Sequence, residues 1–113
     1  MNVNLELYKV FYIVAKNKSI SRAANEMLIS QPAISKAVKT LEEQINTQLF
    51  IRRRDGVLLT EAGQVLYKKI KEAMALIYSA ENDLEVLTSM ESGIINIGAS
   101  KTIIGEFLMP YIK

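Results

Sequence analysis

The chain has 113 residues, enough for one domain, of which 50% are hydrophobic and 23% charged, as in folded globular proteins. It contains no cysteine and no histidine, which excludes disulfide scaffolds, thiol nucleophiles, imidazole acid-base catalysis and almost every zinc site. The net charge of +2 is unevenly spread: residues 1–71 hold 12 basic and 6 acidic residues, and residues 72–113 hold 2 and 6. The basic segment indicates a surface for a phosphate backbone, with ordinary solvated lysines as the alternative.

No segment of the sequence indicates export or a membrane. The N-terminus has no basic run ahead of an apolar stretch, so no signal peptide is expected, and no apolar run is long enough to span a bilayer. We therefore expect a cytoplasmic protein without a membrane partner.

Two short helices are predicted at the start of the chain. Apolar residues at helical spacing predict the first over residues 4–16. Ser19 is expected to cap the second, over residues 19–28, because its hydroxyl can accept an N–H of the first turn. Ala23 and Ala24 would let another helix cross this one closely.

A third helix is predicted up to about residue 44, with Ser30 as its cap and Pro32 in its first turn. Its apolar residues recur at spacings of three and four, and those expected to face inward are Ile34, Val38, Leu41 and Ile45. The residues expected to face outward are Gln31, Ser35, Lys36, Lys39 and Glu43. This helix therefore combines a buried face with an exposed polar face.

A small β-hairpin is predicted after the third helix. Asn46 is expected to take the left-handed conformation that ends the helix. Two apolar stretches then flank the turn dipeptide formed by Asp55 and Gly56. We interpret this hairpin as a β-wing, and the residues that crowd its tip are Arg52, Arg53 and Arg54.

A long helix is predicted over residues 60–92, with Thr60 as its cap and Gly93 as the next breaker. Its apolar residues follow heptad spacing: Leu66, Ile70, Ala73, Ile77, Ala80, Leu84 and Leu87. This seam could pack on its own domain, but at about 30 Å it is longer than the short elements before it. We therefore predict that the long helix dimerises with a second copy of the chain.

The last residues are expected to begin another domain. A strand is predicted over residues 94–98, followed by a helix with Ser100 or Thr102 as its cap. One strand and one helix cannot bury their faces alone, so we interpret them as the start of an incomplete α/β domain. The predicted fold is thus mainly α with a small β-wing, and its parts are residues 1–59, 60–92 and 93–113.

Two helices joined by a short turn, the second opening with Ser-Gln-Pro, form a helix-turn-helix pattern. Residues 7–63 resemble the LysR-type transcriptional regulators, at the separations that this family uses. The motifs that carry the resemblance are SQPAIS at 30–35, LE at 41–42, LF at 49–50 with Arg52, and LTEAG at 59–63. The long helix and the strand also resemble that family's dimerisation helix and the start of its effector-binding domain.

The resemblance implies a winged helix-turn-helix whose third helix reads the major groove of double-stranded DNA. Gln31 and Ser35 stand one turn apart near the start of this helix, and a Gln amide can pair bidentately with adenine. Lys36 can donate to guanine or phosphate, although the family often has Arg there, so the fork geometry is lost. The other expected contacts are Arg22, Ser30, Lys39, Thr40, Arg52, Arg53 and Arg54.

The arginines of the wing are expected to separate by strand alternation. Arg52 and Arg54 would lie on one side and Arg53 on the other, so that at least one enters a narrow minor groove. Arg52 could instead brace the fold through a carboxylate. The residues expected in the core include Ala23, Ala24, Ala33, Leu41 and Phe50.

The resemblance further implies a transcription regulator that binds an inverted-repeat operator as a homodimer or homotetramer under the control of a small-molecule co-inducer. Ser100 and Thr102 occupy a turn that often contacts this effector in the family, although a simple helix cap is the alternative. No cofactor, metal or catalytic site is expected, and a nuclease or recombinase would lack metal ligands. The alternative from another class is a winged-helix protein-interaction module without specific DNA binding.

Overall fold

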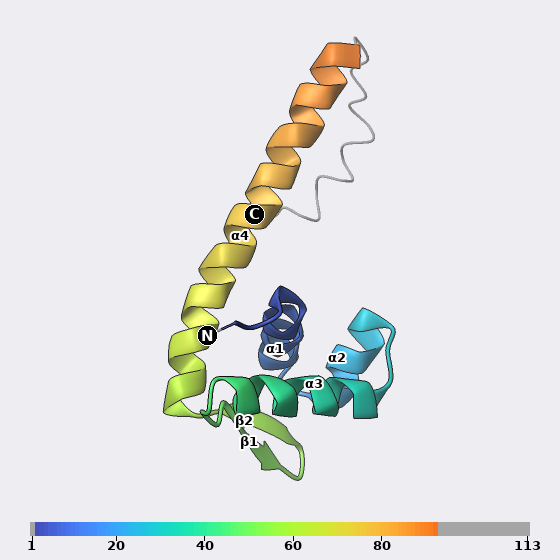
Figure 1. Ribbon diagram of the computed structural model, residues 1–113. Helices are drawn as coiled ribbons and strands as arrows, with labels where there is room; N and C mark the ends of the chain where they lie inside the picture. Colours follow the sequence, from blue (N-terminus) through green and yellow to red (C-terminus); the bar gives the residue numbers. More distant parts are fainter. Residues whose placement is uncertain (1, 93–113) are drawn as a thin grey trace. The chain divides into compact units, whose positions relative to one another are not determined.

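The computed structural model describes residues 2–92 (Figure 1). Its elements are, in chain order, α1 (Leu5–Asn17), α2 (Ile20–Met27), α3 (Gln31–Gln44), β1 (Phe50–Arg53), β2 (Gly56–Leu59) and α4 (Glu61–Ser92). This order confirms the predicted mainly α fold with a two-stranded wing and a long helix. The strand and helix predicted within residues 93–113, with Ser100 and Thr102, lie outside the described residues.

The first compact unit of the chain ends within α4, at Ile70. The first unit therefore includes the opening turns of α4. The start of this helix belongs to the fold of the winged domain.

Hydroxyl caps fix where three of the helices begin, as the sequence predicted. The hydroxyls of Ser19, Ser30 and Thr60 each accept the N–H of the residue three positions on, at 3.1, 3.2 and 2.9 Å. Each bond satisfies one backbone donor that has no partner inside its helix. Asn4 caps α1 in a similar way, since its Oδ1 accepts the N–H of Glu6 at 2.7 Å.

The core of the first unit lies where α1, α2, α3 and the wing meet (Figure 1). Its largest fully buried side chains are Phe11, Ile34, Leu41, Leu49 and Val14. Burying a side chain of this size contributes about 1.5–3 kcal/mol. The rings of Phe11 and Phe50, with centroids 5.3 Å apart, join α1 to the wing.

Most of the predicted core residues are buried, but Ala33 is exposed. It follows Pro32 in the first turn of α3 and lies one residue from Ile34, which is fully buried. Ala33 lies about 100° around the helix axis from Ile34, outside the face of α3 that Ile34, Val38 and Leu41 bury. The placement of Ala33 in the core was therefore wrong.

The wing is an antiparallel pair in which Arg52 is opposite Val57 and Arg53 is opposite Gly56. The turn between the strands is therefore made by Arg54 and Asp55, one residue earlier than predicted. Gly56 instead begins β2 with a φ of 149°, a conformation that favours glycine.

Three non-glycine residues adopt left-handed backbone conformations at the ends of helices, namely Lys18, Leu28 and Asn46, with φ of 56°, 60° and 54°. This conformation was predicted for Asn46, whose short polar side chain tolerates it. Lys18 and Leu28 follow α1 and α2, and their backbone N–H groups bond to carbonyls of the last helical turn. Here the connection between helices imposes a conformation that the residue itself does not favour.

The first turns of α4 pack on the core of the first unit. Leu66 and Ile70, two of the predicted seam residues, are half-buried against this core. The rings of Tyr12 and Tyr67 stack beside them, with centroids 5.8 Å apart and planes 19° apart. These two seam positions thus pack in part on their own domain. The seam residues that are exposed are Ala73, Ile77, Ala80, Leu84 and Leu87.

Candidate nucleic-acid interface

The turn between α2 and α3 sets the direction in which α3 begins. Leu28 reverses the chain, and the N–H of Ile29 then donates to the carbonyl of Ala24 at 3.1 Å. Ser30 caps α3, and Pro32 occupies its first turn, where a missing N–H breaks no helical bond. The start of α3 is therefore held at the surface.

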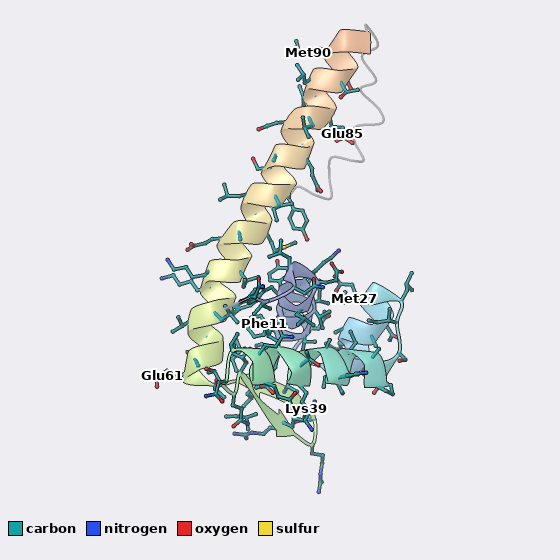
Figure 2. All side chains as sticks on the ribbon, in the orientation of Figure 1. Phe11, Met27, Lys39, Glu61, Glu85 and Met90 are labelled. Carbon is teal, nitrogen blue, oxygen red and sulfur yellow. The ribbon has the colours of Figure 1, made fainter. Side chains whose placement is uncertain are left out.

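One face of α3 carries exposed polar side chains. Gln31, Lys36 and Lys39 are exposed, while Ser35 and Thr40 are half-buried. Figure 2 shows Lys39 on the side of α3 that faces away from α1. Burial of Ile34, Val38 and Leu41 on the opposite side fixes this orientation.

The wing places its arginines in three different settings. Arg52 shares a face of the hairpin with the buried Phe50 and Val57, whereas Arg53 lies on the other face. Arg54 lies in the turn, so strand alternation does not place it with Arg52 as predicted. The guanidinium groups therefore spread around the tip of the hairpin.

A depression of about 430 Å³ lies between the start of α3 and the wing. It brings together four of the predicted DNA-contacting residues, Gln31, Arg52, Arg53 and Arg54. Its other lining residues come from the start of α2 and from the hairpin, and they are Ser19, Ile20, Ser21, Asp55, Gly56 and Val57. The exposed Ser21 was not among the predicted site residues. Its position in the first turn of α2, directly before the predicted contact Arg22, was the signal that could have found it.

Not all the predicted residues lie in this depression. Lys39 lines a separate concavity of about 380 Å³ at the end of α3, together with Glu42 and Glu43. Arg22 is exposed on α2, and Ser30 is exposed where it caps α3. The predicted set therefore spans a surface larger than one pocket.

The basic side chains of this surface have no acidic partner. Lys36, Lys39 and the wing arginines make no ion pair within the described part of the chain, although Glu42 and Arg52 line one cavity of about 270 Å³. The alternative role of Arg52, an ion pair with a carboxylate that braces the fold, is thus not seen within residues 2–92. Unpaired cations on a polar surface favour binding of an anion.

Residues 2–92 offer neither a metal site nor a membrane-spanning helix. No group of acidic side chains there could hold a metal ion. No helix in the same range is both long and apolar enough to cross a membrane.

A family model described as bacterial regulatory helix-turn-helix protein, lysR family, matches residues 5–64. The chain is 40% identical over 106 residues to a probable RuBisCO transcriptional regulator of Cyanidioschyzon merolae, covering 94% of this chain and 35% of that protein. An uncharacterized HTH-type transcriptional regulator of Methanocaldococcus jannaschii is 32% identical over 112 residues, covering 99% and 38%. The chain thus spans about a third of the length of these curated relatives.

Solved structures share the fold. OxyR of Corynebacterium glutamicum is 28% identical with a TM-score of 0.67, covering 75% of this chain and 26% of that one. DarR of Vibrio fischeri, solved in complex with DNA, is 26% identical with a TM-score of 0.64, covering 80% and 31%. The chain belongs to the lysR family of bacterial regulatory helix-turn-helix proteins.

Proposed function

We propose that the chain is the DNA-binding part of a LysR-type transcription regulator, with α3 in the major groove and the wing in the neighbouring minor groove. The observation that carries the proposal is the exposed polar face of α3 beside the unpaired wing arginines. Curated relatives named as transcriptional regulators and the structure of DarR with DNA support it. The proposed role is binding rather than catalysis, in the cytoplasm.

Base reading is assigned to the start of α3. Gln31 is exposed one turn before Ser35. Its side-chain amide can form a bidentate pair with adenine, in which the amide N–H donates to N7 and the amide oxygen accepts from the N6 amino group. Lys36 lies beside Ser35 and can reach guanine or a phosphate. These three side chains would determine which DNA sequence the protein prefers.

Backbone contacts are assigned to the edges of the same surface. Lys39, Arg22 and the hydroxyls of Ser30 and Thr40 would fix the register of the protein on the duplex through phosphate contacts. Arg53, on the outer face of the hairpin, is the best placed arginine for a narrow minor groove. Arg52 and Arg54 would contact the adjoining phosphates.

Dimerisation is assigned to the exposed part of the seam in α4. Ile77, Leu84 and Leu87 are exposed by 49%, 62% and 53%. The small side chains of Ala73 and Ala80, in the same seam, would allow close approach of another helix. A two-fold dimer would present two copies of α3 to successive major grooves, so its operator would be an inverted repeat. Tetramers and a small-molecule co-inducer would belong to the longer protein, in which residues 93–113 begin the effector-binding domain.

A second candidate function is a protein-interaction module that does not bind specific DNA. The exposed apolar residues of α4 favour it, because they would recruit a partner without help from the basic surface. The two functions differ in their response to salt.

Titration of DNA binding with salt tests the proposed function. Neutralised phosphates release counterions, so log affinity should fall linearly with log salt, with a slope of about −0.9 for each phosphate contact. The DNA would be fragments that the chain selects from a random pool, with an unselected duplex as the control. Absence of binding, or binding that salt does not weaken, would favour the interaction module.

A further inference from the structure

The side chain of Glu42 joins the recognition helix α3 to the start of the wing. One carboxylate oxygen, Oε2, accepts the backbone N–H of Leu49 at 2.7 Å and that of Phe50 at 3.1 Å. Leu49 directly precedes β1, and Phe50 is its first residue. Hydrogen bonds from N–H groups to an ionised carboxylate are about twice as strong as those between neutral groups. The contact is therefore a strong link between two elements proposed to touch DNA.

The backbone of Glu42 strengthens the same link. Its carbonyl accepts the N–H of Thr47 at 3.0 Å, within the loop that leads from α3 to β1. Asn46 in this loop is left-handed, with a φ of 54°, so the chain reverses sharply between the two elements. One residue thus holds both the loop and the first residue of the strand.

The wing is also attached to other parts of the first unit, and its buried residues Phe50 and Val57 share the core with Val38 of α3. The N–H of Val57 in β2 donates to the carbonyl of Lys18 at 3.2 Å, and Phe50 packs on Phe11 of α1. Without the carboxylate of Glu42, the hairpin would stay attached to the core, but Leu49 and Phe50 would lose their hydrogen bonds to the side chain of α3. Its angle to α3 would then be less well defined.

We propose that Glu42 is a positioning residue for DNA binding, which fixes the wing relative to α3 so that Arg53 and Gln31 engage one duplex together. This inference rests on the proposed function. A DNA duplex is stiff, and the two grooves are separated by a phosphate backbone, so a displaced hairpin would lose the groove contact of Arg53 while α3 kept its own. The role of Glu42 is thus exerted through Arg53.

A double-mutant cycle between Glu42 and Arg53 tests the proposal. Affinity for the selected DNA would be measured for wild type, Glu42→Ala, Arg53→Ala and the double variant. Residues that act through one contact are not additive, so Arg53→Ala should weaken binding at least about threefold less in the Glu42→Ala background than in wild type. A purely structural role for Glu42 would lower the melting temperature but leave the effect of Arg53→Ala unchanged.

Three further variants serve as controls for the double-mutant cycle. Glu43→Ala removes the neighbouring carboxylate, which is exposed and makes no hydrogen bond in the described residues, so the effect of Arg53→Ala should stay as in wild type. Gln31→Ala should show no coupling to Glu42→Ala, because α3 itself does not move. Glu42→Gln keeps one acceptor oxygen and should restore part of the coupling; it also serves as the folded variant if Glu42→Ala does not fold.

The outcomes separate this inference from the proposed function. If wild type binds DNA and the losses from Glu42→Ala and Arg53→Ala simply add, the positioning role is wrong and the proposed function stands. If Arg53→Ala has no effect on its own, the positioning role is also wrong. If wild type shows no salt-sensitive binding to DNA, the proposed function itself fails.

Discussion

Gly63 in α4 lies so close to the backbone carbonyl of Leu49 that a methyl group at Gly63 would overlap with that oxygen. The same carbonyl accepts the N–H of Thr60 at 2.9 Å, and the hydroxyl of Thr60 accepts the N–H of Gly63 at 2.9 Å. The first turn of α4 is therefore in direct contact with Leu49, the residue that precedes the wing. This explains why the motif at 59–63 needs glycine at its end.

Gly63→Ala is expected to lower the free energy of unfolding, although alanine favours a helix by about 1 kcal/mol over glycine. The added Cβ meets backbone atoms rather than a flexible side chain, so α4 or the Leu49 segment must move, which typically costs about 1–3 kcal/mol. Urea denaturation of the chain measures the net change. Gln64→Ala, at the exposed neighbouring position, is the control and should be nearly neutral. A more stable Gly63→Ala variant would contradict the close contact.

Leu28→Asn is expected to raise stability. Leu28 has a φ of 60° and is 89% exposed, so its side chain gains little from burial while its backbone is strained. Asparagine tolerates this conformation, and the gain should be about 0.5–1 kcal/mol. Leu5→Asn is the matched control, because Leu5 is 79% exposed but helical, and it should give no gain. Equal effects at the two positions, measured by urea denaturation, would argue against strain at Leu28.

Glu26 is expected to give the stability a small pH dependence. Burial raises the pKa of its carboxyl, but hydrogen bonds from Asn17 and Lys16 and the charge of Lys16 outweigh burial, so the pKa lies below its ordinary value. A lowered pKa means that the ionised form stabilises the fold above the unfolded-state pKa, and that this stabilisation is lost as pH falls through the folded-state pKa.

Glu26→Gln should therefore cost stability near neutral pH and cost nothing in acid. The pair with Lys16 is well exposed, so the loss at neutral pH should be about 0.2–1 kcal/mol. Denaturation curves across the acid range measure it, with Glu43→Gln as a control that lacks a partner. A difference that grows as the pH falls would contradict the assignment.

Ile77→Glu is expected to produce monomers. It places a charge in the middle of the proposed seam, where pairing of two helices would have to bury it. Val86→Glu is a matched control, since Val86 is 52% exposed, against 49% for Ile77, and lies about half a turn round the helix from it. Sedimentation should give monomers for Ile77→Glu and dimers for both Val86→Glu and wild type. A dimeric Ile77→Glu variant would place the interface elsewhere.

Features that depend on near neighbours in the chain could be predicted from the sequence. The caps at Ser19, Ser30 and Thr60 act within three residues, and the buried face of α3 follows from its spacing of apolar residues. The left-handed Asn46 also follows from the chemistry of its own side chain. The three helices, the wing and the long helix were thus predicted within a residue or two.

Features that depend on distant parts of the chain could not be predicted from the sequence. The turn of the wing was placed one residue late because the position of Gly56 depends on the carbonyl of Lys18, which β2 approaches only in the folded chain. Heptad spacing likewise does not reveal that Leu66, at the start of α4, packs in part on its own domain.

The candidate site, too, could be predicted from the sequence only in part. Exposure of Gln31 on α3 could be predicted from helical periodicity, but its meeting with Ser21 and the wing arginines required the fold. The two hydrogen bonds of Glu42 were likewise not predicted, because they join a helix to a strand across a loop. Contact of these residues with DNA stays a prediction.

The most direct test is the affinity of the Gln31→Ala variant for DNA selected by wild type and for random DNA. If the start of α3 reads bases, the variant should lose about 1–3 kcal/mol of binding free energy on the selected DNA and almost nothing on random DNA. Lys39→Ala, assigned to phosphate contact, should weaken both alike. An equal loss on the two DNAs from Gln31→Ala would contradict the reading of sequence by α3.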